Sequence, residues 1–299
     1  MRVQIAPRES MLDASAKWPN FFIVGAVRAG TTSLYEYLRG VDGVYLSPIK
    51  EPRFFSSTDE PPAYAPPRIR SEAEYLKLFD KAGSAAAIGE ASPQYLCDAQ
   101  APAAIHAAEP DARIIMVLRD PVERAFSHYL LHRRMGVQPL AAPEQALKND
   151  IYLKNGLYSA AVERYLTLFG ARGVKVLIFD DFVRDTSAAM REVLDLLGVR
   201  GAAAETTGKV YNAYGEPRGR VRRAIYRSVP MKIAARKLFS DRLRRSAREN
   251  LLLGQSEKPA MPDATRAFLE SFYRDDVMKL ERVIGRALPW FHARRSAPT

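Results

Sequence analysis

Residues 20–34 read NFFIVGAVRAGTTSL. The run 20–25 is apolar after its first residue, which is typical of a strand buried on both faces of a parallel sheet. A glycine-bearing turn follows, and from Thr31 the apolar residues Leu34, Tyr37 and Leu38 recur at helical spacing until Gly40. We therefore predict a strand, a loop and a helix in that order.

The same alternation continues along the chain. Further strands are predicted at residues 44–46, 87–89, 113–118 and 174–179, and the main helices at 31–40, 121–134, 158–169, 186–197 and 263–284. This alternation favours an α/β fold with a mostly parallel central sheet and helices on both faces. Residues 1–19 are predicted to be a loose lead-in and residues 20–299 a single domain, because the sequence shows neither a repeat nor a convincing linker.

Composition narrows the class of protein. The 299 residues are 47% hydrophobic and 26% charged, which excludes fibrous and disordered chains. Cys97 is the only cysteine, so no intramolecular disulfide forms. The start of the sequence lacks the apolar run of a signal peptide, and the longest apolar runs are too short to span a membrane, so we expect a cytoplasmic protein.

The positive charge is concentrated in one segment. Residues 218–248 contain twelve Arg and Lys residues against a single acid, Asp241, whereas the whole chain has a net charge of +11. This segment is interpreted as a solvated helical face, as a lid for an anionic glycan, or as a peripheral membrane contact toward a lipid acceptor. A nucleic-acid partner is not expected, because interleaved aromatic residues and known reader motifs are absent. The oligomeric state is left open.

The loop from Gly25 to Thr32 has the G-x-x-x-x-G spacing of a phosphate-binding loop. Its backbone N–H groups and the following helix N-terminus can hold an anion. Thr31 stands where nucleotide triphosphatases have a lysine, and the cation of the loop is Arg28. We therefore expect an anion shorter than a triphosphate, the alternative being a glycine-rich turn without a ligand.

A second signal lies in residues 114–129, IIMVLRDPVERAFSHY. A buried strand ends at Arg119, Pro121 fits the first turn of the next helix, and Ser127 lies about two turns further on. Ligands of open α/β sheets bind at the carboxyl ends of the strands, so Arg119 and Ser127 are candidates for a second anion site. The alternatives are a surface ion pair between Arg119 and Asp120, or Asp120 as a metal-binding acid of a phosphotransferase.

These motifs resemble those of sulfotransferases that use 3′-phosphoadenosine 5′-phosphosulfate (PAPS). VGAVRAGTTSL at 24–34 is similar to the 5′-phosphosulfate loop, and VLRDPVERAFSHY at 117–129 to the 3′-phosphate motif. SPIKEPRFF at 47–55 and GEASPQY at 89–95 are similar to two further family stretches, with weaker similarity around Tyr158, Lys258 and Trp290. The resemblance covers roughly residues 20–290 and points to bacterial soluble members and glycosaminoglycan sulfotransferase domains.

The resemblance implies a P-loop NTPase-like fold and transfer of a sulfuryl group from PAPS to an acceptor hydroxyl or amine, without a metal. The acceptor would be a carbohydrate, a lipid-linked molecule or another small molecule, and the product adenosine 3′,5′-bisphosphate (PAP). By this resemblance, Glu51 is the general base. Arg28, which stands where many members carry a catalytic lysine, stabilises the leaving group. The residues that the resemblance assigns to cofactor binding are Arg28, Ala29, Gly30, Thr31, Thr32, Ser33, Arg119, Ser127, Tyr158, Arg218 and Gly219.

Some roles and functions stay open at this point. His128 is assigned at most a supporting role, and Glu90 is either structural or catalytic. The alternative enzyme is a small-molecule kinase that uses Mg-ATP. The alternative without catalysis is a basic adaptor that binds anionic surfaces through residues 218–248.

Overall fold

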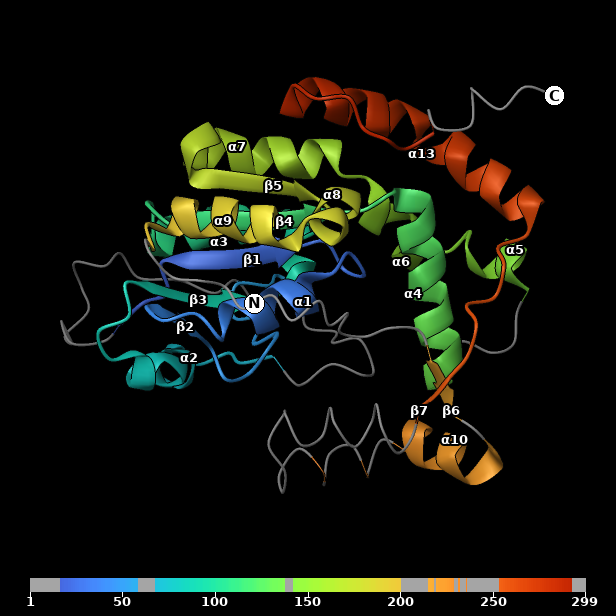
Figure 1. Ribbon diagram of the computed structural model, residues 1–299, viewed down its shortest axis with the longest axis horizontal. Helices are drawn as coiled ribbons and strands as arrows, with labels where there is room; N and C mark the ends of the chain where they lie inside the picture. The colour runs from blue at the N-terminus through green and yellow to red at the C-terminus, as the bar shows by residue number, and fades with distance from the viewer. Residues whose placement is uncertain are drawn as a thin grey trace.

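The computed structural model describes residues 17–58, 68–137, 142–199, 215–217, 219–228, 231, 235 and 253–291. Its core is a five-stranded sheet with the order β2-β3-β1-β4-β5 and parallel pairing throughout (Figure 1). The strands are β1 (Phe21–Gly25), β2 (Val44–Leu46), β3 (Ala87–Ala91), β4 (Arg113–Leu118) and β5 (Val174–Ile178). The predicted α/β fold is confirmed, and each predicted strand agrees with an observed one to within two residues at either end.

The central strands are buried because both faces of the sheet are covered. Every residue of β1 and β3 is buried, as is all of β4 after Arg113. Close packing limits the choice of residue at Gly89 in β3. A Cβ atom there would lie 2.5 Å from the ring of Phe21 on the neighbouring strand.

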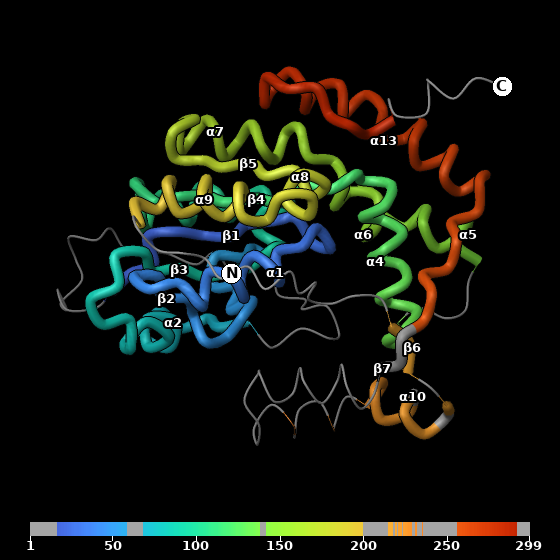
Figure 2. The backbone as a smooth tube through the Cα atoms, viewed as in Figure 1, coloured from blue at the N-terminus to red at the C-terminus, as the bar shows by residue number. Residues whose placement is uncertain are grey.

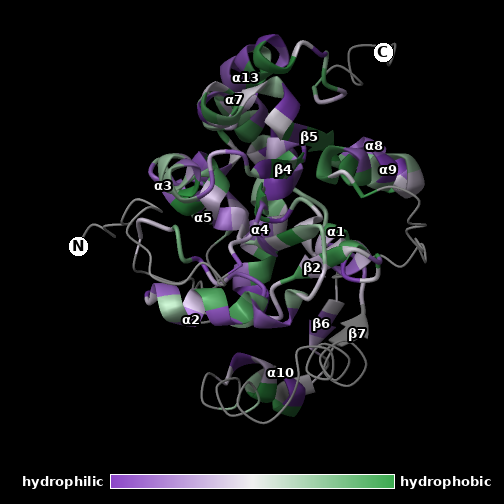
Figure 3. Ribbon diagram, turned by 90° about the vertical axis from the view of Figure 1, so that its left-hand side faces the viewer, coloured by the Kyte–Doolittle hydropathy of each residue, from purple (hydrophilic) through white to green (hydrophobic). Residues whose placement is uncertain are grey.

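Helices form a layer on each side of the sheet (Figure 3). One layer holds α1 (Thr31–Leu38), α8 (Phe179–Arg184) and α9 (Thr186–Leu197), and the other holds α3 (Ala101–Ala108) and α7 (Ser159–Gly173). The long helix α13 (Asp263–Ile284) packs against α7 and against α4 (Pro121–Met135). The buried face of α13 includes Leu269, Tyr273, Val277 and Leu280.

Short elements complete the described chain. They are α2 (Glu72–Leu76), α5 (Pro143–Ala146), α6 (Asp150–Leu153), and the 3-10 helices η2 (Lys77–Ala82), η3 (Pro93–Leu96) and η4 (Lys154–Gly156). The antiparallel pair β6 (Gly215–Pro217) and β7 (Leu253–Gln255), together with α10 (Gly219–Arg227), lies at the C-terminal end of α4 (Figure 2). Arg134 of α4 anchors this unit, since it donates to the backbone carbonyl of Gly215 over 2.8 Å.

The end of the predicted lead-in packs on the domain. Trp18 lies 6.1–6.3 Å, ring centroid to ring centroid, from Phe54, Phe55 and Tyr75. Residues 1–16 and most of the basic segment 218–248 lie outside the described residues. Within the ranges that the structure describes, no helix is both long and apolar enough to cross a membrane.

Candidate active site

The loop between β1 and α1 leads directly into the N-terminus of α1. Gly30 precedes α1 with a φ of 90°, and no side chain caps the first turn of the helix. The first N–H groups of a helix carry partial positive charge and attract anions. A Cβ atom at Gly30 would also meet the Phe179 ring at 3.1 Å. The backbone angle therefore favours glycine here, and the packing leaves little room for a side chain.

Three side chains predicted to bind the donor come together beside this loop. The Nε of Arg28 donates to the Oγ of Ser127 over 3.1 Å. The Nη1 of Arg119 donates to the backbone carbonyl of Arg28 over 3.3 Å, and its guanidinium lies 4.7 Å from the centroid of the Phe179 ring. Arg119 is half-buried in this position, with 20% of its side chain exposed. Two cations and a hydroxyl thus adjoin the α1 N-terminus.

Tyr158 lies behind this cluster. It is completely buried, and its hydroxyl donates to the backbone carbonyl of Arg119 over 3.0 Å. Its own backbone N–H donates to the carboxylate of Asp276 in α13 over 2.7 Å. The structure therefore connects Tyr158 to the backbone of Arg119, and its predicted contact with the nucleotide stays a prediction.

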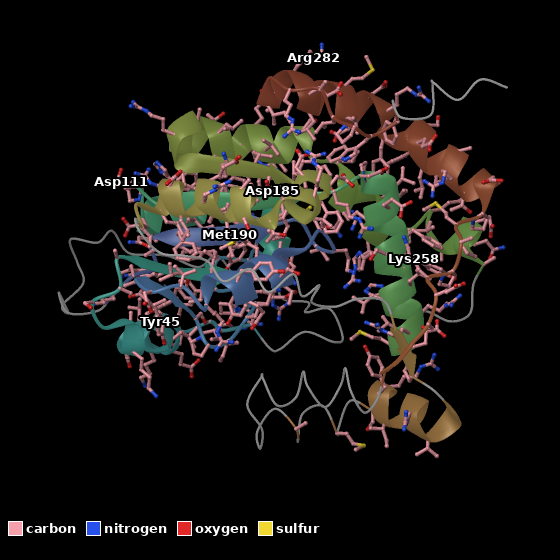
Figure 4. The ribbon with its side chains drawn as sticks, viewed as in Figure 1. Tyr45, Asp111, Asp185, Met190, Lys258 and Arg282 are labelled. Atoms are coloured by element: carbon pink, nitrogen blue, oxygen red, sulfur yellow. The ribbon has the colours of Figure 1, made fainter. Side chains whose placement is uncertain are left out.

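Glu123 forms ion pairs with two further cations next to Arg119. Lys258 donates to one carboxylate oxygen over 2.7 Å, Arg266 to the other over 2.8 Å, and Arg119 lies 4.0 Å away. Figure 4 shows Lys258 beside α4. Burial raises the pKa of Glu123, but the hydrogen bonds and charges of Lys258 and Arg266 bring it down to about 2. Sequence reasoning did not place Lys258 or Arg266 in the site. Lys258 carried a weak similarity, and Arg266, from a helix 143 residues later, carried no local signal.

Asp120 caps the helix that carries Ser127. Its carboxylate accepts from the backbone N–H groups of Val122 and Glu123 over 2.8 and 3.4 Å. Burial raises the pKa of Asp120 to about 6, although these two hydrogen bonds oppose the rise. Capping accounts for this acid without the metal-binding role that a phosphotransferase would give it.

The predicted base lies on the other side of the β1 loop. Glu51 has a φ of 66°, and its backbone N–H donates to the carbonyl of Ala91 at the end of β3 over 2.9 Å. Its carboxylate accepts from Lys50 over 3.0 Å and from Gln94 over 2.8 Å. Burial alone raises the pKa of Glu51, but the charge of Lys50 and these hydrogen bonds outweigh it and hold the pKa below its ordinary value. The carboxylate is therefore ionised at neutral pH.

A buried carboxylate lies under the loop that carries Glu51. Glu90 is completely buried and accepts hydrogen bonds from Tyr95 over 2.7 Å, from Ser92 over 2.7 Å and from Tyr75 over 3.2 Å. Ser92 and Tyr95 in turn bind the loop, since their hydroxyls accept from the backbone N–H groups of Arg53 and Phe55 over 3.1 Å each. These contacts favour the structural alternative for Glu90.

The predicted supporting histidine is buried next to a cation. His128 is 3% exposed and its Nδ1 lies 3.4 Å from the Nη1 of Arg124, which is itself completely buried. Burial and the charge of Arg124 hold the pKa of His128 well below its ordinary value, so the ring is neutral at pH 7. Its place next to Ser127 is compatible with a supporting role.

Two further residues predicted to bind the cofactor are Arg218 and Gly219. Arg218 lies outside the described residues. Gly219 begins α10, which is bound to the opposite end of α4: Arg227 donates to the carbonyl of Arg133 over 3.2 Å. Ser127 lies two turns nearer the N-terminus of that helix. A role for Arg218 and Gly219 in cofactor binding stays a prediction.

Comparisons with known proteins identify the family of this chain. A model of the sulfotransferase family matches residues 59–202. The solved sulfotransferase from Alicyclobacillus acidocaldarius is 31% identical, with a TM-score of 0.65, and the alignment covers 91% of this chain and 98% of that chain. The chain belongs to the sulfotransferase family. The predicted resemblance to this family is therefore confirmed.

The chain is also similar to sulfotransferases from mammals. Human heparan sulfate glucosamine 3-O-sulfotransferase 6 is 28% identical over 198 residues, which are 62% of this chain and 53% of the human protein. The chain thus spans about half the length of that curated relative. A mouse sulfotransferase solved in complex with PAP shares the fold, with 14% identity, a TM-score of 0.51, and 90% of this chain and 88% of that chain covered.

Proposed function

We propose that this sulfotransferase transfers the sulfuryl group of PAPS to a hydroxyl of a carbohydrate acceptor, with Glu51 as general base and Arg28 as leaving-group stabiliser. The observation that carries the proposal is the cluster of Arg28, Ser127 and Arg119 beside the uncapped N-terminus of α1. Charge-assisted hydrogen bonds from arginine suit phosphate and sulfate oxygens. An adenosine carrying a 5′-phosphosulfate and a 3′-phosphate presents two such groups.

The strand order places the donor-site cations and Glu51 on different sides of the loop that follows β1. Strand β1 lies between β3 and β4, and neighbouring strands are about 4.8 Å apart. Glu51 is hydrogen-bonded to the end of β3, whereas Arg119 directly follows β4. The cations of the donor site and the ionised carboxylate therefore flank the same phosphate loop from opposite sides.

The chemistry needs one proton acceptor and a stabilised leaving group. When bound, PAPS supplies the sulfuryl group, and the bridging oxygen takes the electron pair of the broken S–O bond and leaves with PAP. The carboxylate of Glu51 accepts the proton of the attacking hydroxyl, and a nearby anion raises its pKa toward working pH. The guanidinium of Arg28 stabilises the negative charge that develops on the leaving oxygen.

The acceptor class rests on the relatives. The human relative is named for a heparan sulfate glucosamine, and mouse carbohydrate sulfotransferase 15 is 27% identical over 250 residues, covering 60% of this chain and 44% of the mouse protein. These names support a carbohydrate in preference to a lipid-linked or other small-molecule acceptor, and an oxygen in preference to an amine.

Calorimetric titration tests the donor site. PAP, adenosine 5′-monophosphate and Mg-ATP are titrated into the wild-type protein and into Arg119→Ala and Arg119→Lys. We expect Arg119→Ala to weaken PAP binding by about 10- to 100-fold, because a hydrogen bond to a charged group contributes about 1.5–3 kcal/mol. Binding of adenosine 5′-monophosphate, which lacks the 3′-phosphate, should stay unchanged, and Arg119→Lys should keep part of the PAP affinity. Mg-ATP binding without PAP binding would favour the kinase, and salt-sensitive PAP binding that is indifferent to Arg119 would favour the adaptor.

A transfer assay tests the base. Radioactive sulfate transfer from PAPS to a panel of heparan-type and chondroitin-type oligosaccharides is compared in wild type and Glu51→Gln. Glu51→Gln should lower turnover by about 10²- to 10⁴-fold, the usual contribution of general base catalysis, while the Kd for PAP hardly changes. Turnover that survives in the variant removes Glu51 from the mechanism.

A further inference from the structure

Gln94 binds the carboxylate of Glu51 from another part of the chain. Gln94 lies in η3, just after β3, and its Nε2 donates to the Oε2 of Glu51 over 2.8 Å. In the family stretch GEASPQY, Gln94 stands at a position that the resemblance leaves unspecified. The resemblance therefore says nothing about this contact.

The orientation of the Gln94 amide follows from its contact with Glu51. Its Oε1 is buried and has no hydrogen-bond partner within the described part of the chain. The opposite amide orientation would place Oε1 against the carboxylate of Glu51, where two acceptors repel. The N–H group of the Gln94 amide therefore faces the carboxylate of Glu51.

The segment around Gln94 also holds the backbone of the loop that carries Glu51. The carbonyl of Ala91 accepts from Glu51, and the hydroxyls of Ser92 and Tyr95 accept from the backbone of the residues that follow. Glu51 and Arg53 adopt φ values of 66° and 55°, which residues with side chains rarely do and which need support from their surroundings. Residues 91–95 therefore fix the backbone of the loop that carries Glu51, and Gln94 also binds the carboxylate of Glu51.

We propose that Gln94 is a positioning residue that holds the Glu51 carboxylate in one orientation for proton transfer from the acceptor. This inference rests on the proposed role of Glu51 as base. A free carboxylate rotates among several orientations, and a hydrogen bond to Oε2 from a rigid element removes most of that freedom. Gln94 is not itself in the reaction, since it acts through Glu51.

The titration midpoint of Glu51 provides a test of the proposal that does not depend on turnover. The charged groups that face the carboxylate are Lys50 and Arg53 on its own loop and Glu90 on β3. The two cations favour the ionised form, and Glu90 is protonated in the pH range where Glu51 titrates, because its own pKa is raised to about 7. Gln94 is uncharged, so its contribution is a hydrogen bond to the ionised form, and its loss leaves both cations unchanged.

The test compares Gln94→Leu and Gln94→Glu with Gln100→Leu. Leucine removes the N–H donor and keeps most of the volume, and glutamate keeps the shape but replaces the donor with a like charge. Gln100 is exposed at the start of α3, so Gln100→Leu is the matched control. Calorimetric titration with PAP verifies that each variant is folded and binds the donor as the wild type does.

Two measurements are made on these proteins. The titration midpoint of Glu51 is followed by NMR of ¹³C-labelled glutamate carboxyls, with Glu51→Gln used to assign the signal. We expect Gln94→Leu to raise this midpoint by about 1–2 pH units, the equivalent of one hydrogen bond to a charged group. The second measurement is kcat for the oligosaccharide that accepts sulfate from the wild type. It should fall about tenfold in Gln94→Leu and further in Gln94→Glu. The acid limb of the pH profile should shift to higher pH, and the KM for PAPS should stay unchanged.

The outcomes separate this inference from the proposed function. If Glu51→Gln retains turnover, the proposed base is wrong and the role of Gln94 in the reaction falls with it. If Glu51→Gln is inactive but Gln94→Leu has the wild-type kcat and pH profile, the base stands and the positioning role is refuted. A fall in kcat accompanied by an equal fall in PAP affinity would also refute it, since that pattern marks general damage to the site.

Discussion

The buried Glu90 makes a quantitative prediction about stability. Its carboxylate has no contact with solvent, and burial outweighs the hydrogen bonds from Ser92, Tyr95 and Tyr75 and raises its pKa from 4.5 to about 7. The substitution Glu90→Gln keeps the shape of the side chain and removes the ionisable group. Any difference in pH dependence between variant and wild type is then due to this one residue.

The sign and size follow from proton linkage. Between pH 4.5 and 7 the native protein keeps the Glu90 proton while the unfolded chain has lost it, so the free energy of unfolding falls as the pH rises through this window. At about 1.36 kcal/mol per pH unit, the whole effect is about 3 kcal/mol. Most of it, about 2.5 kcal/mol, falls between pH 5 and pH 8.

Urea denaturation of wild type and Glu90→Gln at several pH values between 5 and 8 measures this effect. At pH 5 the variant should be less stable than the wild type, because glutamine cannot accept all three hydroxyl donors as the carboxyl does. The difference should shift by about 2.5 kcal/mol in favour of the variant by pH 8. Two stability curves that run parallel across this range would refute the reasoning, because Glu90 would then titrate alike in the folded and unfolded protein.

Two further substitutions probe the donor side of the site. Tyr158→Phe removes the hydrogen bond to the carbonyl of Arg119 and should lower the free energy of unfolding by about 1 kcal/mol and PAP affinity a few-fold; an unchanged calorimetric Kd would show that Tyr158 does not position Arg119. Gly30→Ala forces a side chain into a φ of 90° and against Phe179, so it should destabilise the protein by about 1–3 kcal/mol and weaken PAP binding. The control Gly40→Ala lacks both constraints, and thermal unfolding that treats the two glycine variants alike would contradict this account.

Local pattern was sufficient for the regular elements of the fold. Residues 44–46 and 113–118 were predicted as strands with the observed boundaries, and the helices at 186–197 and 263–284 likewise. These segments show strong periodicity or a continuous apolar run, and both signals come from neighbouring residues. The short helices, such as α2 and α6, were not predicted, because five or four residues are too few to show a helical period.

The site was predicted in part. The residues of the phosphate loop, Arg119 and Ser127 could be found because each follows a strand in a recognisable stretch. The contacts of Glu123 with Lys258 and Arg266 could not, because these cations come from segments more than 130 residues away. Nothing in the local sequence of α13 distinguishes Arg266 from the other charged residues of that helix.

The types of residue at the carboxyl ends of the strands, and the order of strands and helices, can be read from local sequence. Which of these residues come into contact depends on the tertiary fold. Arg28 and Ser127 are 99 residues apart and Glu51 and Gln94 are 43 apart, yet each pair is hydrogen-bonded. The strand order β2-β3-β1-β4-β5 is not the chain order, and it is fixed by the pairing and packing of the whole sheet. That order places the arginine cluster and the ionised carboxylate on opposite sides of one loop. The local sequence could not predict this placement, because long-range contacts are not encoded in any single segment.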